Sequence, residues 1–169
     1  LVEHFGINKV AFTGSTSVGR EIREMTAGSG KALTLELGGK SPFIVFADAD
    51  LDSAVEGVVD AIWFNQGQVC CAGSRLLVQE SVADDFLSRL KMRMQSLRLG
   101  DPMDKAIDMG AIVDQGQLDT IRSYVEGAAK EGASCWQADS GVPDQGWYFP
   151  PTLVTDVAPA HTIATEEVF

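Results

Sequence analysis

Two adjacent cysteines, Cys70 and Cys71, lie in the stretch FNQGQVCCAGSR, between a polar loop and an apolar run. A thiolate is a strong nucleophile, and side-chain amides and backbone N–H groups stabilise both the thiolate and an oxyanion that it creates. Cysteine is also among the most buried residue types, so two inert core thiols are the favoured interpretation of this stretch alone. Cys135, the third cysteine, is expected to be a structural or surface thiol. Three is an odd number, which predicts a reducing, cytoplasmic environment rather than a disulfide framework.

A second candidate for chemistry is Glu36, which ends an apolar run in the stretch LELGGKSP. Loss of water around a carboxylate at such a position would suit it to work as a general base. An exposed glutamate at the end of a strand explains the same pattern equally well. Gly39, Lys40 and Ser41 imitate the end of a phosphate-binding P-loop, but Thr34 stands where that motif requires its first glycine, so we reject a P-loop.

The stretch FTGSTSVG, residues 12–19, predicts a strand, a turn of small residues and the start of a helix. Free N–H groups and the helix dipole converge at such a turn and favour anions. The stretch matches neither the G-x-G-x-x-G pattern nor a Walker A loop. By itself it is best explained as a tight connection between a strand and a helix.

Composition excludes several classes of function. The net charge is −11, and the 13 Lys and Arg residues are scattered, so we expect no binding of nucleic acid. No apolar run approaches the roughly 20 residues that span a bilayer, and the first residues do not resemble a signal peptide. His4 and His161 are far apart without clustered partners, so no metal site is predicted. The densest basic group predicts a solvated helix face: Arg89, Lys91, Arg93 and Arg98.

The elements that must position these residues follow an α/β order. Short apolar runs predict strands at residues 7–12, 33–36, 42–46 and 75–79. Apolar residues at helical spacing predict helices over residues 18–27, 54–63, 82–94 and 118–128, with Asp50 or Asp52 capping the second. Residues 141–159 predict turns and short edge strands, and residues 164–169 predict the start of another helix. Alternation of strands and helices predicts an α/β fold.

Taken together, these motifs resemble the NAD(P)-dependent aldehyde dehydrogenase superfamily along essentially the whole chain. The matching stretches, in order, are FTGSTSVG, LELGGKSPFIV, DADLD, FNQGQVCCAGSR and EEVF. The stretches RLLVQESVADDF and FPPTLV further resemble the family sixteen type. The resemblance implies that residues 1–37 are the C-terminal part of a Rossmann-type cofactor domain and that residues 38–169 form most of an α/β catalytic domain.

The resemblance also implies a role for individual residues. The nucleophile of the family falls on Cys70, two places after the second Gln of NQGQ, and Cys71 is not expected to act. The general base falls on Glu36. The cofactor would be NAD or NADP, and the residues implied for it are Gly14, Ser15, Thr16, Val18 and Gly19 in the turn, then Leu37, Glu167 and Phe169.

The implied reaction is oxidation of a small aldehyde to a carboxylic acid through a thiohemiacetal and a thioester on Cys70. Glu36 favours hydrolysis of the thioester over its transfer to coenzyme A. The alternative is a non-catalytic scaffold that acts through protein partners, because the family sixteen type includes members without the nucleophile; the presence of Cys70 and Glu36 argues against it. By resemblance the chain is a central segment of a longer homo-oligomeric enzyme, and we expect the isolated segment to be inactive.

Overall fold

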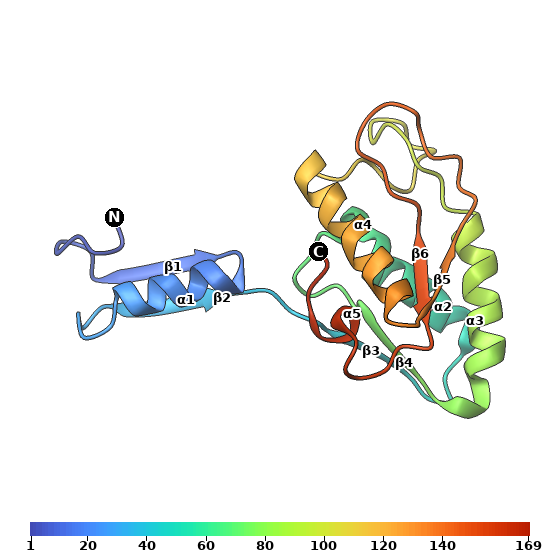
Figure 1. The fold of residues 1–169 in the computed structure, drawn as a ribbon, viewed down its shortest axis with the longest axis horizontal. Helices are drawn as coiled ribbons and strands as arrows, with labels where there is room; N and C mark the ends of the chain where they lie inside the picture. Colours follow the sequence, from blue (N-terminus) through green and yellow to red (C-terminus); the bar gives the residue numbers. More distant parts are fainter. The chain divides into compact units, whose positions relative to one another are not determined.

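The computed structural model describes residues 1–169, which divide into two compact units, Leu1–Gly39 and Lys40–Phe169 (Figure 1). The division falls after the two glycines of LELGGK. No helix in either unit combines the length and the apolar character needed to cross a membrane.

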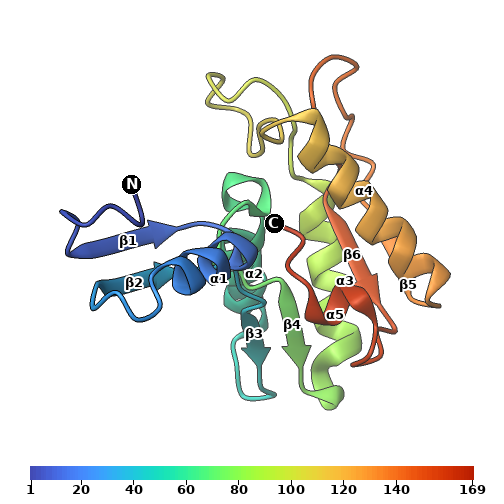
Figure 2. The same cartoon turned by 60° about the vertical axis from the view of Figure 1, so that its left-hand side comes forward.

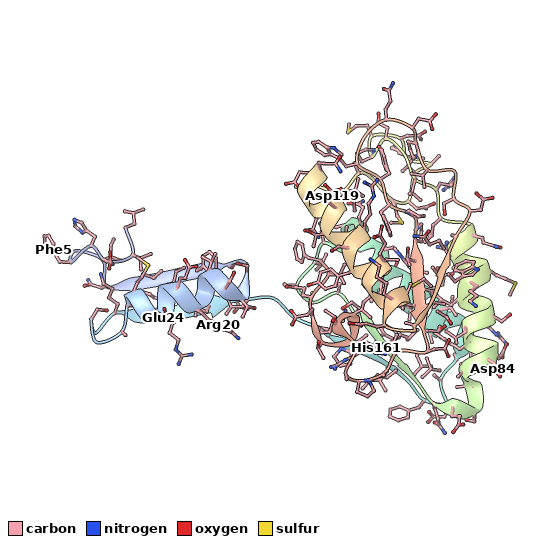
Figure 3. All side chains as sticks on the ribbon, viewed as in Figure 1. Phe5, Arg20, Glu24, Asp84, Asp119 and His161 are labelled. Carbon is pink, nitrogen blue, oxygen red and sulfur yellow. The ribbon has the colours of Figure 1, made fainter.

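The first unit is a strand–helix–strand motif. Strands β1 (Lys9–Thr13) and β2 (Ala32–Glu36) pair in parallel, so that Thr13 lies opposite Glu36 at their carboxyl ends. Helix α1 (Thr16–Met25) connects them and buries Ile22, while polar residues such as Arg20 and Glu24 lie on its exposed surface (Figure 3). Burial alternates along both strands, because successive side chains of a strand point to opposite faces. The predicted strands and helix of this unit are confirmed.

The larger core of the second unit lies between a short sheet and two helices. Strands β3 (Pro42–Val45) and β4 (Arg75–Val78) run side by side in parallel (Figure 2). Helix α2 (Leu51–Trp63) begins where the Asp50 carboxylate accepts the backbone N–H of Ser53 at 2.9 Å, and helix α3 (Glu80–Gln95) packs against α2. Their apolar faces form one cluster, which includes Val45, Val55, Val58, Val59, Trp63, Phe86, Leu90 and Met94.

The remainder of the second unit surrounds helix α4 (Gln115–Lys130). Strands β5 (Ser134–Gln137) and β6 (Thr152–Thr155) pair antiparallel, and a single helical turn, α5 (Thr162–Thr165), packs beside α4. A smaller apolar cluster lies at the start of α4 and consists of Ile112, Leu118 and Ile121, with Phe149 and Val168 packed against it.

Two sequence-based expectations need correction. Strand β5 was not predicted, since its four residues SCWQ carry no alternating pattern and are defined by pairing with β6. The helix expected over residues 164–169 is wrong: α5 ends at Thr165, and Glu166 is already extended. The carbonyls of Val168 and Phe169 accept hydrogen bonds from the Gln117 side chain instead of continuing a helix.

Candidate active site

The Cys70 loop, residues 64–74, connects α2 to β4. It begins with a 3-10 turn, η1 (Phe64–Gly67), in which Asn65, Gln66 and Gly67 have φ angles of 49°, 58° and 78°. Three consecutive residues in the left-handed region reverse the chain sharply, and the first two carry strain because they are not glycine. Gly67 is required at its position: a Cβ there would lie 3.1 Å from the carbonyl oxygen of Ile62.

Hydrogen bonds between near neighbours hold this loop in shape. The backbone N–H of Gln68 donates to the Asn65 carbonyl at 3.0 Å, and the Asn65 side-chain amide donates to the Gln68 carbonyl at 3.1 Å. The N–H of Ala72 donates to the Val69 carbonyl at 3.0 Å. Most of the hydrogen bonds that shape the Cys70 loop are therefore local.

Cys70 and Cys71 are both exposed free thiols, and so is Cys135. This corrects the interpretation of the pair as buried core residues: burial resumes only at Ala72, the next residue. The backbone N–H groups of Cys70 and Cys71 donate to no acceptor within the chain. A reachable thiol beside unused N–H donors can act as a nucleophile and can stabilise an oxyanion formed on its substrate.

In the first unit, the residues expected at the cofactor turn lie together with Glu36. The N–H of Gly14 donates to the Glu36 carbonyl at 3.0 Å, and the hydroxyl of Ser15 caps α1 by accepting the N–H of Val18 at 3.4 Å. Gly19 is buried beneath the side chain of Leu37, which leaves no room for a Cβ. The turn and the candidate base therefore share one edge of the parallel pair, where ligands bind in open α/β sheets.

Within this unit Glu36 is exposed, as in the alternative interpretation of an exposed glutamate at the end of a strand. The cause is its register: Glu36 shares the exposed face of β2 with Ala32 and Thr34, whereas Leu33 and Leu35 on the other face are half-buried. Its position opposite Thr13, at the end of the strand pair, leaves the carboxylate reachable by water.

In the second unit, residues in and just before α4 contact both regions expected to carry function. The side-chain oxygen of Gln68 accepts the backbone N–H of Val113 at 3.1 Å, next to Asp114, which caps α4. From the first turn of α4, the Gln117 Nε2 group donates to the carbonyls of Val168 at 2.9 Å and Phe169 at 2.8 Å. Sequence analysis missed both glutamines. Gln68 stands in the NQGQ motif, but no local signal marks Gln117.

Lys40, which the sequence suggested only for the rejected P-loop, is a further residue near the expected cofactor site. It is half-buried, and burial is the main reason that its pKa lies below the ordinary value of 10.5. The positive charge of Arg75 lowers the pKa of Lys40 further, and the negative charge of Glu167 opposes the change. Lys40 thus lies within the electrostatic field of Glu167, one of the residues expected at the cofactor.

Comparison with known proteins identifies the family. The sequence profile described as "Aldehyde dehydrogenase family" matches residues 1–169, the whole chain. The chain belongs to the aldehyde dehydrogenase family. A protein named betaine aldehyde dehydrogenase from Rhizobium johnstonii is 44% identical over 173 residues, which cover 100% of this chain and 35% of that protein.

Solved structures of the family have the same fold. The NAD-dependent aldehyde dehydrogenase from Sinorhizobium meliloti gives a TM-score of 0.93 at 38% identity, covering 99% of this chain and 34% of that one. An NAD+ complex of aldehyde dehydrogenase from Bacillus cereus gives a TM-score of 0.92 at 40% identity, with 99% and 34% covered. The chain therefore spans about a third of the length of the family members it matches, and its α/β fold is that of an aldehyde dehydrogenase.

Proposed function

We propose that the intact protein oxidises a small aldehyde to a carboxylic acid with NAD or NADP, using Cys70 as the nucleophile and Glu36 as the general base. The observation that carries this proposal is the exposed Cys70 thiol, with unused backbone N–H donors beside it, at the nucleophile position of an aldehyde dehydrogenase chain. No observation favours the non-catalytic scaffold, and the family sixteen assignment stays a prediction.

The first task of Cys70 is to bind the substrate covalently. The thiolate attacks the aldehyde carbonyl carbon, a C–S bond forms, and the carbonyl electron pair moves to oxygen. The backbone N–H of Cys70 can donate to that oxyanion, because no acceptor within the chain uses it. Cys71 is also exposed, but it lies one place beyond the nucleophile position, and we assign it no catalytic role.

The turn at residues 13–16 fits the pyrophosphate of a dinucleotide. It opens the ten-residue helix α1, whose first turn contains no acidic residue, and Ser15 and Ser17 place their hydroxyls together there, 3.1 Å apart. Thr16 and Val18 follow in the first turn of the helix, and Val18 is partly exposed. When bound, the nicotinamide would accept hydride from the carbon attached to Cys70, which leaves a thioester.

Glu36 would complete the reaction by hydrolysis. Its exposed carboxylate can take a proton from water, which then attacks the thioester carbon and releases the acid and the Cys70 thiolate. The main-chain hydrogen bond between Gly14 and Glu36 fixes this residue relative to the cofactor turn. A position beside the cofactor turn suits a base that acts after hydride transfer, in hydrolysis of the thioester.

The remaining assignments are proposals of the same kind. We assign residues 1–37 to the cofactor domain and residues 38–169 to the catalytic domain. Glu167 and Phe169 would hold the nicotinamide ribose, and the backbone of Leu37 would face the nicotinamide. The intact protein would be a homo-oligomer in a reducing, cytoplasmic environment.

A pair of matched variants tests the nucleophile. In the intact protein, C70S should lower aldehyde-dependent NAD(P) reduction by at least about a hundredfold, because a hydroxyl is a far weaker nucleophile than a thiolate, while C71S should retain most of the activity. Iodoacetamide at neutral pH should label Cys70 before Cys71 and Cys135, as read by peptide mass spectrometry. Equal losses in C70S and C71S, or preferential labelling of another cysteine, would overturn the proposal.

A further inference from the structure

The 156–169 segment, which follows β6 and carries Glu167 and Phe169, has little structure of its own. Its only regular element is the single turn α5, and most of its residues are partly or fully exposed. His161, labelled in Figure 3, precedes that turn and provides no side-chain cap. A single helical turn is unstable in water by itself, so contacts with other elements must hold this segment in place.

One anchor is at the start of α4, near the end of the segment. Gln117 donates to the carbonyls of Val168 and Phe169, and the Val168 side chain packs against the cluster of Ile112, Leu118 and Ile121. This anchor fixes the chain after Glu167 and leaves the chain before it undetermined.

The other anchor is at the far end of α4. Glu131 follows the last residue of that helix, and its Oε1 accepts the Thr162 hydroxyl at 2.6 Å while its Oε2 accepts the Thr162 N–H at 2.9 Å. A carboxylate that accepts two hydrogen bonds from one residue restricts both its position and its orientation. The same hydrogen bonds hold the pKa of Glu131 below its ordinary value, so the ionised form is the one that binds Thr162.

We propose that Glu131 and Thr162 are positioning residues, whose paired hydrogen bonds hold the 156–169 segment so that Glu167 and Phe169 are preorganised for the nicotinamide ribose. The inference rests on the proposed function for its ligand, and on the two anchors for its geometry. Glu167 lies between them, and α4 is a continuous 16-residue helix that fixes their separation. Without the Glu131 anchor, the chain before Glu167 is held less tightly, and cofactor binding must then supply part of the free energy that orders it.

Thr162→Val tests this inference, because valine keeps the shape and the N–H but removes the hydroxyl donor. In the intact protein, T162V should raise the dissociation constant for NAD about three- to tenfold, the effect of one typical net hydrogen bond. kcat at saturating NAD should stay within about twofold, since the chemistry at Cys70 is untouched. T162S keeps the hydroxyl and should restore the wild-type affinity. Isothermal titration calorimetry with NAD and steady-state kinetics give these values.

Thr165→Val is the matched control. Thr165 lies on the same turn, is exposed like Thr162, and its hydroxyl donates to the Thr162 carbonyl at 3.2 Å rather than to Glu131. T165V should bind NAD like the wild type. Hydrogen exchange supplies a second readout without cofactor: amides of residues 163–167 should exchange faster in T162V than in T165V, while those of the Cys70 loop should not change.

The outcomes separate this inference from the proposed function. Equal NAD affinity in T162V and T165V overturns the positioning role, and equal exchange in the two overturns the anchor itself. If T162V does not fold, E131Q replaces it: the amide accepts only one of the two hydrogen bonds, and wild-type NAD affinity in E131Q would overturn the inference. Failure of the wild-type intact protein to bind NAD would instead refute the proposed function, and the exchange comparison would still decide whether the anchor exists.

Discussion

The Cys70 loop and the 156–169 segment are held in place in opposite ways. The loop is stabilised mainly by partners about three residues away, such as the mutual hydrogen bonds of Asn65 and Gln68, with a distant side-chain contact from the Val113 N–H to Gln68. The segment depends on partners 31 and 52 positions away, at Glu131 and Gln117. The local hydrogen bonds of the loop do not depend on distant parts of the chain, whereas the segment depends on its contacts with Gln117 and Glu131. The proposed nucleophile thus lies on a loop held mainly by local contacts, and the residues proposed for the ribose lie on a segment held by distant ones.

A substitution in the apolar cluster beneath Val168 should give the largest difference in hydrogen exchange between the 156–169 segment and the Cys70 loop. Leu118 is buried in the cluster that Val168 packs against, and Leu118→Ala should lower the free energy of unfolding by about 2–5 kcal/mol through lost burial and a cavity. Chemical denaturation gives this value, and hydrogen exchange should increase more in residues 166–169 than in the Cys70 loop. An equal increase in both regions would mean that the loop depends on α4 as much as the segment does.

A substitution of Gly67 should destabilise the Cys70 loop instead of the 156–169 segment. Gly67→Ala places a Cβ where φ is 78° and where the Ile62 carbonyl oxygen lies 3.1 Å away, so we expect a loss of about 1–3 kcal/mol and slower alkylation of Cys70. Gly127→Ala is the matched control, because Gly127 is inside α4 and a Cβ there meets nothing within 4 Å. That variant should gain up to about 1 kcal/mol. Thermal or denaturant unfolding compares the two, and equal effects would contradict a strained turn at Gly67.

Acid should loosen the segment before it affects the loop. The Thr162 hydroxyl, then the Thr162 N–H and the charge of His161, lower the pKa of Glu131 from its ordinary 4.5. A carboxyl whose folded pKa is depressed contributes stability above its unfolded pKa and loses it as the pH falls through the folded pKa. Exchange of residues 163–167 should therefore rise relative to that of the Cys70 loop below about pH 4.5, and E131Q should remove this difference. A pH dependence that persists in E131Q would assign the titration to another group.

Local sequence patterns predicted the elements whose structure depends on residues close together in the sequence. Helical spacing predicted α2, α3 and α4, because a buried apolar stripe has the helical period, and Asp50 was recognised as a possible cap. The adjacent cysteines and Glu36 were recognised as candidates, but local patterns left each with a competing interpretation. Their proposed roles come from the family resemblance, since a residue's chemistry depends on neighbours that its own stretch does not contain.

What remained hidden is formed by contacts between distant residues. Strand β5 exists through pairing with β6, and the chain does not continue as a helix after Thr165, where Gln117 and the cluster around Leu118 hold Val168. The exposure of Glu36 also depends on which face of β2 the fold covers.

The sequence alone determined the family, the order of most helices and strands, and the residues proposed for chemistry, because turns, caps and apolar periods are set by near neighbours. The tertiary structure alone decided that Cys70 and Cys71 are exposed, that Gln68 accepts the Val113 N–H, that Gln117 binds the Val168 carbonyl, and that Glu131 holds Thr162. These contacts join residues tens of positions apart, and only packing of the whole unit brings such residues within hydrogen-bonding distance.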